Sequence, residues 1–255
     1  MRSVSVYFLS LLLACNLAQA EAPPIQQWID EAIQAGGGVV TIPEGEHVLE
    51  KGLVIKDAKK LAIRGVDKER CILKLAASTQ DSALIQITGT CETLEIAGLT
   101  LVTGLPESYK VPAKTDELAA SIKDVTLRDC LLQNFPGSAI SIQHATAVSI
   151  ERCSFRDGTG AAMRWENAQS CIAQGNQIIR VATAFDLQSG HACLLEGNEV
   201  RDSQVAMLIS SPRPQPPEAR HTLRNNSFYN VAEGLDISTV QPAPLSEKND
   251  GLDAR

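Results

Sequence analysis

The sequence predicts an all-β solenoid, in which short parallel strands stack turn upon turn behind a short N-terminal capping α-helix. Three observations predict it. A unit of about 22 residues repeats through the second half of the chain, each unit carries two short strand patterns, and a single stretch has the spacing of an amphipathic helix. Such a unit cannot bury its apolar side chains alone, but stacked units bury them against each other.

The repeat is clearest in five successive units. They begin near Val125, Val148, Cys171, Cys193 and His221. The steps between these positions are 23, 23, 22 and 28 residues, and the last is longest because it contains the proline-rich insert 211–217. Weaker echoes upstream extend the stack to roughly seven or eight turns.

Each unit carries a second strand in which the outer two residues of a triplet are apolar and the middle one is usually polar. The triplets lie at residues 140–142, 163–165, 185–187, 207–209 and 235–237. Successive strand side chains point to opposite sides, so the middle residues should lie on the outer face. Trp165 shares its register position with aliphatic residues, and we therefore assign it to the core.

The helical pattern lies near the N-terminus. Its apolar face consists of Ile25, Trp28, Ile29, Ala32 and Ile33. This is the i, i+3, i+4, i+7 spacing of one helix face, and the glycines at 36–38 should end it. We expect the helix, at about 24–35, to cover the first turn of a solenoid domain that spans 21–238. Residues 239–255 show no strand pattern and are expected to form a C-terminal tail.

The first twenty residues resemble a secretory signal peptide. Arg2 supplies the positive charge, residues 4–14 are apolar, and residues 18–20 fit the small-x-small cleavage pattern. We therefore expect a signal peptide at 1–20 and a secreted or periplasmic protein with no transmembrane segment after its removal. A second interpretation is a lipoprotein anchored through Cys15, because Leu-Leu-Ala-Cys resembles a bacterial lipobox.

The charge balance is acidic, with 23 Lys and Arg against 30 Asp and Glu, a formal net charge of −7. A nucleic-acid partner is not expected, because binding to phosphates requires a basic surface. No Cys/His cluster has the spacing of a zinc site, so a structural metal is not expected either.

Six cysteines remain after loss of the signal peptide. They are Cys71, Cys91, Cys130, Cys153, Cys171 and Cys193. Two pairs should stack on neighbouring turns, Cys130 with Cys153 and Cys171 with Cys193. A Cα spacing of about 4.8 Å admits a disulfide, but stacked strands rarely give the dihedral it needs, and we favour reduced core thiols. Asn176, Asn198 and Asn226 also stack and should form a structural hydrogen-bonded ladder.

Four segments and the repeat carry a resemblance. The segments are residues 25–27 (Ile-Gln-Gln), 36–38 (Gly-Gly-Gly), 39–45 (Val-Val-Thr-Ile-Pro-Glu-Gly) and 61–65 (Leu-Ala-Ile-Arg-Gly). They look like the opening of pectate-lyase-like right-handed β-helix proteins, and the repeat resembles the generic β-helix region of that superfamily. The resemblance covers nearly all of residues 24–238. It implies a right-handed parallel β-helix and a face on which polysaccharide chemistry is carried by acids and bases from successive turns.

The outer face of the second strand carries the candidate catalytic residues. One column reads Ser141, Arg164, Asp186, Leu208, Asp236, and the column two residues further reads Gln143, Glu166, Gln188, Ser210, Ser238. Sheet geometry places the Cα atoms of Glu166 and Asp186 about 8 Å apart. An inverting glycosidase leaves roughly 6.5–9.5 Å between its carboxyl groups. We therefore expect Glu166 and Asp186 to be the acid/base pair, with Arg164 tuning it or binding substrate.

Other polar residues complete the predicted site. The expected substrate-binding residues are Ser141, Gln143, His144, Gln188, Asp236 and Tyr109. Tyr109 lies in the first of two inserts, 104–117 and 211–218, which should fence a groove on this face. In an alternative lyase mechanism, implied by the resemblance, Arg164 lies near a uronate carboxylate and acidic residues bind Ca²⁺.

Two classes of function follow. The first is an exported β-helix protein that acts on polysaccharide, of the glycoside hydrolase or polysaccharide lyase type. The second is a noncatalytic β-helix that binds a glycan or a protein, or a structural solenoid. Oligomeric state, substrate identity and calcium dependence stay open at this point.

Overall fold

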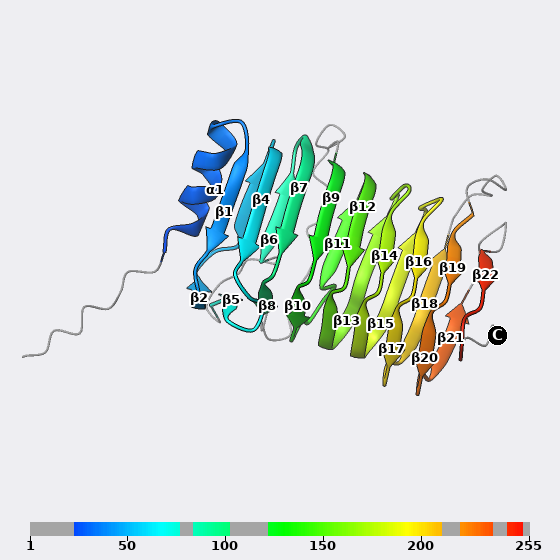
Figure 1. Ribbon diagram of the computed structural model, residues 1–255. Helices are drawn as coiled ribbons and strands as arrows, with labels where there is room; N and C mark the ends of the chain where they lie inside the picture. Colours follow the sequence, from blue (N-terminus) through cyan, green and yellow to red (C-terminus); the bar gives the residue numbers. More distant parts are fainter. Residues whose placement is uncertain (1–22, 77–83, 103–121, 211–219, 237–243, 252–255) are drawn as a thin grey trace, which may run out of the picture.

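The protein forms one continuous stack of parallel strands in a computed structural model (Figure 1). The structure describes residues 23–76, 84–102, 122–210, 220–236 and 244–251. The described part contains one helix, α1 (Ile25–Gln34), at the N-terminal end. No helix among these residues is long and apolar enough to cross a membrane.

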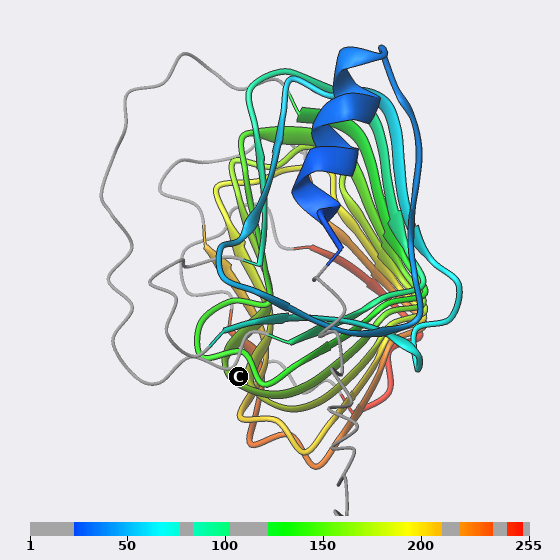
Figure 2. The same ribbon diagram turned by 90° about the vertical axis from the view of Figure 1, so that its left-hand side faces the viewer.

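Helix α1 covers the open end of the first turn, as the sequence predicts (Figure 2). Ile25 and Ile29 are buried against the core. The side chain of Gln26 also satisfies the edge strand: its Nε2 donates to the carbonyl of Val54 at 2.9 Å, and its Oε1 accepts from the Val54 N–H at 2.8 Å. After the helix, Gly37 has φ +125°, and a Cβ there would lie 2.5 Å from the Lys59 carbonyl oxygen. Glycine is therefore needed where the chain turns into the first strand.

The first sheet forms one side of the stack. Its strands, in spatial order, are β1 (Gly38–Ile42), β4 (Lys59–Gly65), β7 (Cys91–Ala97), β9 (Ile122–Arg128), β12 (Ala145–Glu151), β14 (Ile172–Gln174), β16 (Leu194–Glu196), β19 (Thr222–Arg224) and β22 (Leu245–Glu247). Every pair is parallel, so each strand belongs to a successive turn.

The second sheet wraps around a corner and forms the other two sides. Its main path is β2 (Gly45–Leu49), β5 (Cys71–Leu75), β8 (Thr100–Val102), β10 (Leu131–Gln133), β13 (Ser154–Glu166), β15 (Gln177–Gln188), β17 (Glu199–Arg201) and β20 (Ser227–Tyr229). Strands β13 and β15 bend, and their second halves pair with β11 (Ile140–Gln143) and β18 (Val205–Ser210), while β18 pairs with β21 (Glu233–Asp236). On the first two turns, β3 (Leu53–Lys56) pairs with β6 (Ile85–Thr88).

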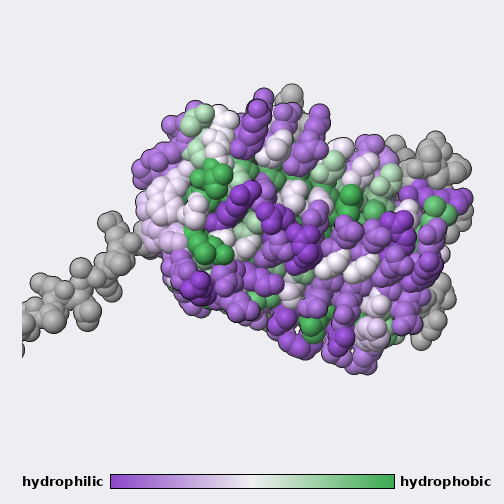
Figure 3. All heavy atoms as spheres, viewed as in Figure 1, coloured by the Kyte–Doolittle hydropathy of each residue, from purple (hydrophilic) through white to green (hydrophobic). Residues whose placement is uncertain are grey.

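Apolar side chains fill the interior, and the register predicted from the repeat is the observed one. Leu127, Ile150 and Ala173 are Cα partners on successive turns, followed by Leu195 and Leu223. Trp165 is 1% exposed, which confirms its assignment to the core. The face seen in Figure 3, by contrast, is mostly hydrophilic, with hydrophobic side chains in smaller patches between the polar ones.

The asparagine ladder forms as predicted and is one rung longer than expected. The Nδ2 of Asn176 donates to the Oδ1 of Asn198, Asn198 donates likewise to Asn226, and Asn226 to Asn249, each at 2.9 Å. Each Oδ1 also accepts the backbone N–H of the preceding rung. The ladder thus satisfies buried polar groups at one corner of the core.

The prediction of a strandless tail from residue 239 is wrong, because β22 and Asn249 lie within it. The strand has only three residues, and Ser246 occupies the inward register position below Leu223. An inward serine breaks the apolar alternation on which the sequence argument depended. A polar residue at this position suits the last described rung, whose outer side has no further turn to bury it.

All six cysteines of the β-helix are free and buried. Stacking is observed for Cys130 with Cys153, where a hydrogen bond between the two thiols and burial raise the pKa of Cys153. A hydrogen bond with the Cys171 thiol and burial likewise raise the pKa of Cys193. Such neutral, buried thiols are core residues rather than reactive ones. The expected signal peptide at 1–20, with Cys15, and the two inserts lie outside the described residues.

Candidate functional site

The outer side chains of the second-strand face form a band that we call the polar strip, consisting of the two predicted columns. In the first column, Ser141, Arg164, Asp186, Leu208 and Asp236 are Cα partners on successive turns. In the second, Gln143, Glu166, Gln188 and Ser210 are partners. The columns predicted from the sequence are therefore the ones that the fold builds. Ser238 lies outside the described residues.

Asp186 is the most tightly held member of the polar strip. Arg164 Nε donates to its Oδ2 at 2.7 Å, and Gln188 Nε2 lies 3.0 Å from both carboxylate oxygens. The sequence predicted an outward carboxylate, yet Asp186 is only 4% exposed. The period-two pattern sets the direction of a side chain but does not show how far its neighbours cover it. Three donor contacts fix the orientation of this carboxyl group.

Glu166 is held more loosely. It accepts one hydrogen bond from Gln143 Nε2, at 3.0 Å, across neighbouring turns. Glu166 is half-buried and Gln143 is exposed. Because Glu166 pairs in register with Gln188, it lies one turn and two residues from Asp186, as the sequence predicts. The two acids thus have different surroundings: Asp186 is fixed and shielded, whereas Glu166 faces solvent.

The other predicted residues lie at the margins. Ser141 is exposed, one turn before Arg164. His144 is exposed just after β11, and its backbone N–H donates to the Glu166 carbonyl at 3.0 Å. Asp236 is separated from Asp186 by the apolar Leu208, so these two acids do not adjoin. Tyr109 lies outside the described residues, and its role stays a prediction.

The described part of the polar strip does not bring together the acidic side chains of a calcium site. Ca²⁺ takes six to eight oxygen ligands. Within its column, however, Asp186 has Arg164 on one side and Leu208 on the other. The described ranges contain no group of three or more His, Cys, Asp or Glu side chains that could hold a metal ion.

A surface hollow of about 320 Å³ lies at the corner just before the polar strip, where β13 and β15 bend. It is lined by Gly158, Thr159, Arg180, Val181, Ala182, Asp202 and Gln204. The corner is tightly built, because Phe135 packs on Gly158 so closely that a Cβ there would lie 1.9 Å from its ring. Sequence reasoning missed this hollow.

The corner nevertheless leaves a signal in the sequence. One residue per turn adopts a left-handed conformation there: Asn134, Asp157, Arg180, Asp202 and Asn230, with φ between 51° and 58°. Asn and Asp tolerate this conformation better than most residues. Their recurrence at the repeat spacing therefore marks the corner, although not the hollow itself.

The fold defines the chain as a parallel β-helix solenoid with one polar strand face. The family model described as the right handed beta helix region matches residues 115–246, which is more than half of the chain. The chain belongs to this family. No curated protein matches it.

Two solved structures illustrate the likeness. The catalytic domain of Agl-KA has a TM-score of 0.56 and 10% identity, covering 92% of this chain and 51% of that one. A tailspike protein mutant of E. coli bacteriophage HK620, in complex with a hexasaccharide, has a TM-score of 0.56 and 12% identity, covering 90% and 47%. The chain spans about half the length of these proteins. Identities this low establish a shared fold alone.

Proposed function

We propose that this is an exported β-helix protein that acts on polysaccharide through the polar strip, with Glu166 and Asp186 as its acid/base pair. The observation that carries the proposal is the placement of two acids in unlike surroundings on adjacent turns. Pairs of titratable groups with unlike environments are the usual basis of acid and base roles. A tailspike of the same fold holds a hexasaccharide in its solved complex.

The hydrogen bonds support a different role for each of the two acids. Arg164 and Gln188 hold Asp186 in one orientation, as a base that activates a water molecule requires. Glu166 has one amide partner and faces solvent, so it is the group placed to donate a proton to a leaving oxygen. Arg164 acts through Asp186, because its Nε is already engaged there.

Hydrolysis is better supported than elimination. One turn and two residues place the Cα atoms about 8 Å apart, near the ~6.5–9.5 Å that inverting glycosidases leave between carboxyl groups. A lyase mechanism needs Arg164 for a uronate carboxylate, but this guanidinium is bound to Asp186 at 2.7 Å. It also relies on Ca²⁺, for which the described part of the strip offers few ligands.

A noncatalytic binding role is the second candidate. The observation that favours it is the burial of Asp186, whose side chain is 6% exposed beside Arg164. A shielded ion pair of this kind also serves to hold neighbouring turns in register. In this case the strip binds a glycan through Gln143, Glu166 and Ser141 without cleaving it.

The test is release of new reducing ends from a panel of neutral and uronate polysaccharides, with and without Ca²⁺. We expect Asp186→Asn and Glu166→Gln each to reduce release at least a hundredfold while glycan binding persists. The matched control is Asp129→Asn: Arg152 and Arg128 hold the pKa of Asp129 below its usual value, but it lies at a different corner of the stack. Turnover that survives in Asp186→Asn would remove this residue from the mechanism. Binding without any turnover would favour the noncatalytic role.

A further inference from the structure

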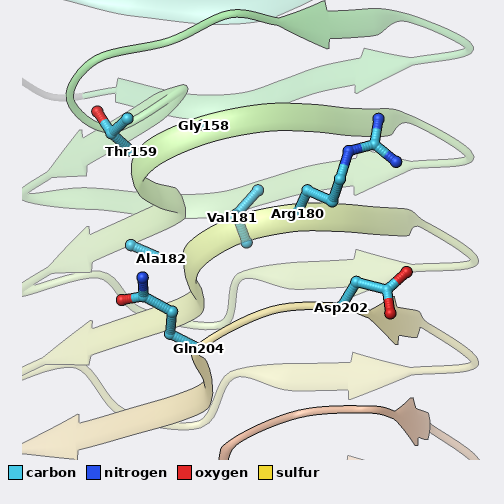
Figure 4. Close-up of a pocket in the computed structure, with 7 residues that line it drawn as sticks. All are labelled: Gly158, Thr159, Arg180, Val181, Ala182, Asp202 and Gln204. Atoms are coloured by element: carbon cyan, nitrogen blue, oxygen red, sulfur yellow. The ribbon is translucent and has the colours of Figure 1, made fainter.

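The corner hollow has the lining of a small polar binding site. Figure 4 shows Thr159 and Gln204 on one side, Arg180 and Asp202 on the other, and the apolar side chain of Val181 between them. Thr159 and Gln204 supply a hydroxyl and an amide. The Thr159 hydroxyl donates to the Pro136 carbonyl at 2.8 Å and so can accept from a ligand, whereas the Gln204 amide can both donate and accept. An apolar floor with a few polar groups on its rim is typical of a site for a small polar molecule.

An exposed aromatic ring lies next to this hollow. Tyr229 is 46% exposed, and the other described aromatic residues are buried or half-buried. The guanidinium of Arg201 lies 5.2 Å from the centroid of its ring. Asn230, the residue after Tyr229, donates a 2.6 Å hydrogen bond to Asp202, which lines the hollow. The ring and the hollow therefore belong to one continuous surface that spans four turns.

The charges of this surface are balanced. Its three arginines are Arg156, Arg180 and Arg201, and its three carboxylates are Asp157, Glu199 and Asp202. Arg180 binds Asp157 through two hydrogen bonds, of 2.6 and 3.1 Å, and Arg201 pairs with Glu199. The polar strip is acidic, since its described part holds Arg164 together with the three acids Asp186, Glu166 and Asp236. Neither of the two surfaces thus offers an excess of cations to an anionic chain.

We propose that the hollow and Tyr229 form a saccharide subsite, separate from the polar strip, that takes consecutive uncharged, hydroxyl-rich units of a saccharide chain. The apolar face of one pyranose ring packs on Tyr229, and hydroxyl groups of the units that follow exchange hydrogen bonds with Asp202, Gln204 and Thr159 on the neighbouring turns. The subsite rests on the proposed function only in that the ligand is a saccharide. It shares strand β15 with Asp186, so a bound chain would reach from the corner to the strip.

The test is calorimetric binding of hexasaccharides to the full chain carrying Glu166→Gln, which prevents turnover. The probes are neutral hexamers of glucose, mannose and galactose, and hexamers of galacturonate and mannuronate. We expect a neutral hexamer to bind, and Tyr229→Ala and Gln204→Ala each to weaken it about three- to tenfold. Tyr229→Phe keeps the ring and should change affinity less than twofold. A melting temperature for each variant shows that it is folded.

Three outcomes would overturn the subsite. Neutral hexamers that bind equally well to all variants would show that the saccharide lies elsewhere, and the proposed function would stand. Tighter binding of the uronate hexamers would contradict the neutral class of ligand. If none of the five probes bound, both the subsite and the saccharide-directed function would fail.

Discussion

Arg164 on one turn donates a 2.7 Å hydrogen bond to Asp186 on the next, and the Asp186 side chain is 6% exposed while the Arg164 side chain is 43% exposed. A pair with one buried and one exposed partner is asymmetric. Removing the arginine leaves a shielded charge without its cation, whereas removing the aspartate leaves a solvated cation. The arginine should therefore contribute measurably to the free energy of unfolding.

Arg164→Ala should lower the free energy of unfolding by about 1–3 kcal/mol, because Asp186 keeps its desolvation cost and loses its charged donor. Arg180→Ala is the matched control, since both partners of the Arg180–Asp157 pair are exposed, and its cost should stay below about 1 kcal/mol. Chemical denaturation of both variants checks this. Equal losses of unfolding free energy in the two variants would show that the burial of Asp186 does not increase the cost of removing its arginine.

Asn198→Ala should destabilise the protein more than Asn249→Ala. The Asn198 side chain donates to the Ala173 carbonyl and to Asn226, and it accepts from Asn176, so its loss leaves several buried groups unsatisfied. We expect a cost of about 2–4 kcal/mol for this variant. Asn249 ends the described ladder and is partly exposed. Asn249→Ala should therefore lower the free energy of unfolding by about half as much as Asn198→Ala. Denaturation curves that rank the two variants in the opposite order would contradict the ladder as a stabilising element.

Stability should fall as the pH drops from about 6.5 to about 4. Burial, with a smaller contribution from His191, lowers the pKa of His221 from 6.5 to about 4. In this window the unfolded chain binds a proton that the folded chain does not, so stability is full above pH 6.5 and is lost on acidification. The loss should amount to about 2–4 kcal/mol. Denaturation at a series of pH values measures it.

His221→Val tests the assignment of this pH dependence. Valine occupies the equivalent register position in two earlier units, at Val125 and Val148. The variant should therefore fold, and its free energy of unfolding should change little between pH 6.5 and 4. His144→Ala, at an exposed position, should keep the pH dependence of the original protein. A slope that survives in His221→Val would assign the proton uptake to another group.

All six cysteines of the β-helix should be recovered as free thiols. They are buried, so alkylation of the folded protein should be slow, and unfolding without reductant should give six modifications by mass spectrometry. Two or four missing modifications would show that stacked pairs such as Cys130 and Cys153 are oxidised. A seventh modification would show that Cys15 is retained.

The sequence by itself determined the solenoid, the capping helix and the direction of most side chains. A spacing of 22 or 23 residues aligns Leu127, Ile150 and Ala173, and parallel stacking makes this alignment a set of physical contacts. The period of two then places Trp165 inside and Arg164 outside. Both columns of the polar strip follow from the same two periods, which is why the candidate residues could be named in advance.

The tertiary structure alone decided burial, hydrogen-bond partners and the position of the hollow. Asp186 points outward as predicted, but the donors on it come from side chains one turn away and two residues along. The hollow forms where β13 and β15 bend, and its lining comes from three turns. Such features depend on side-chain packing and backbone curvature, which a linear period does not specify. The same reason explains why β22, with the exposed Ser246 at the inward register position, was missed.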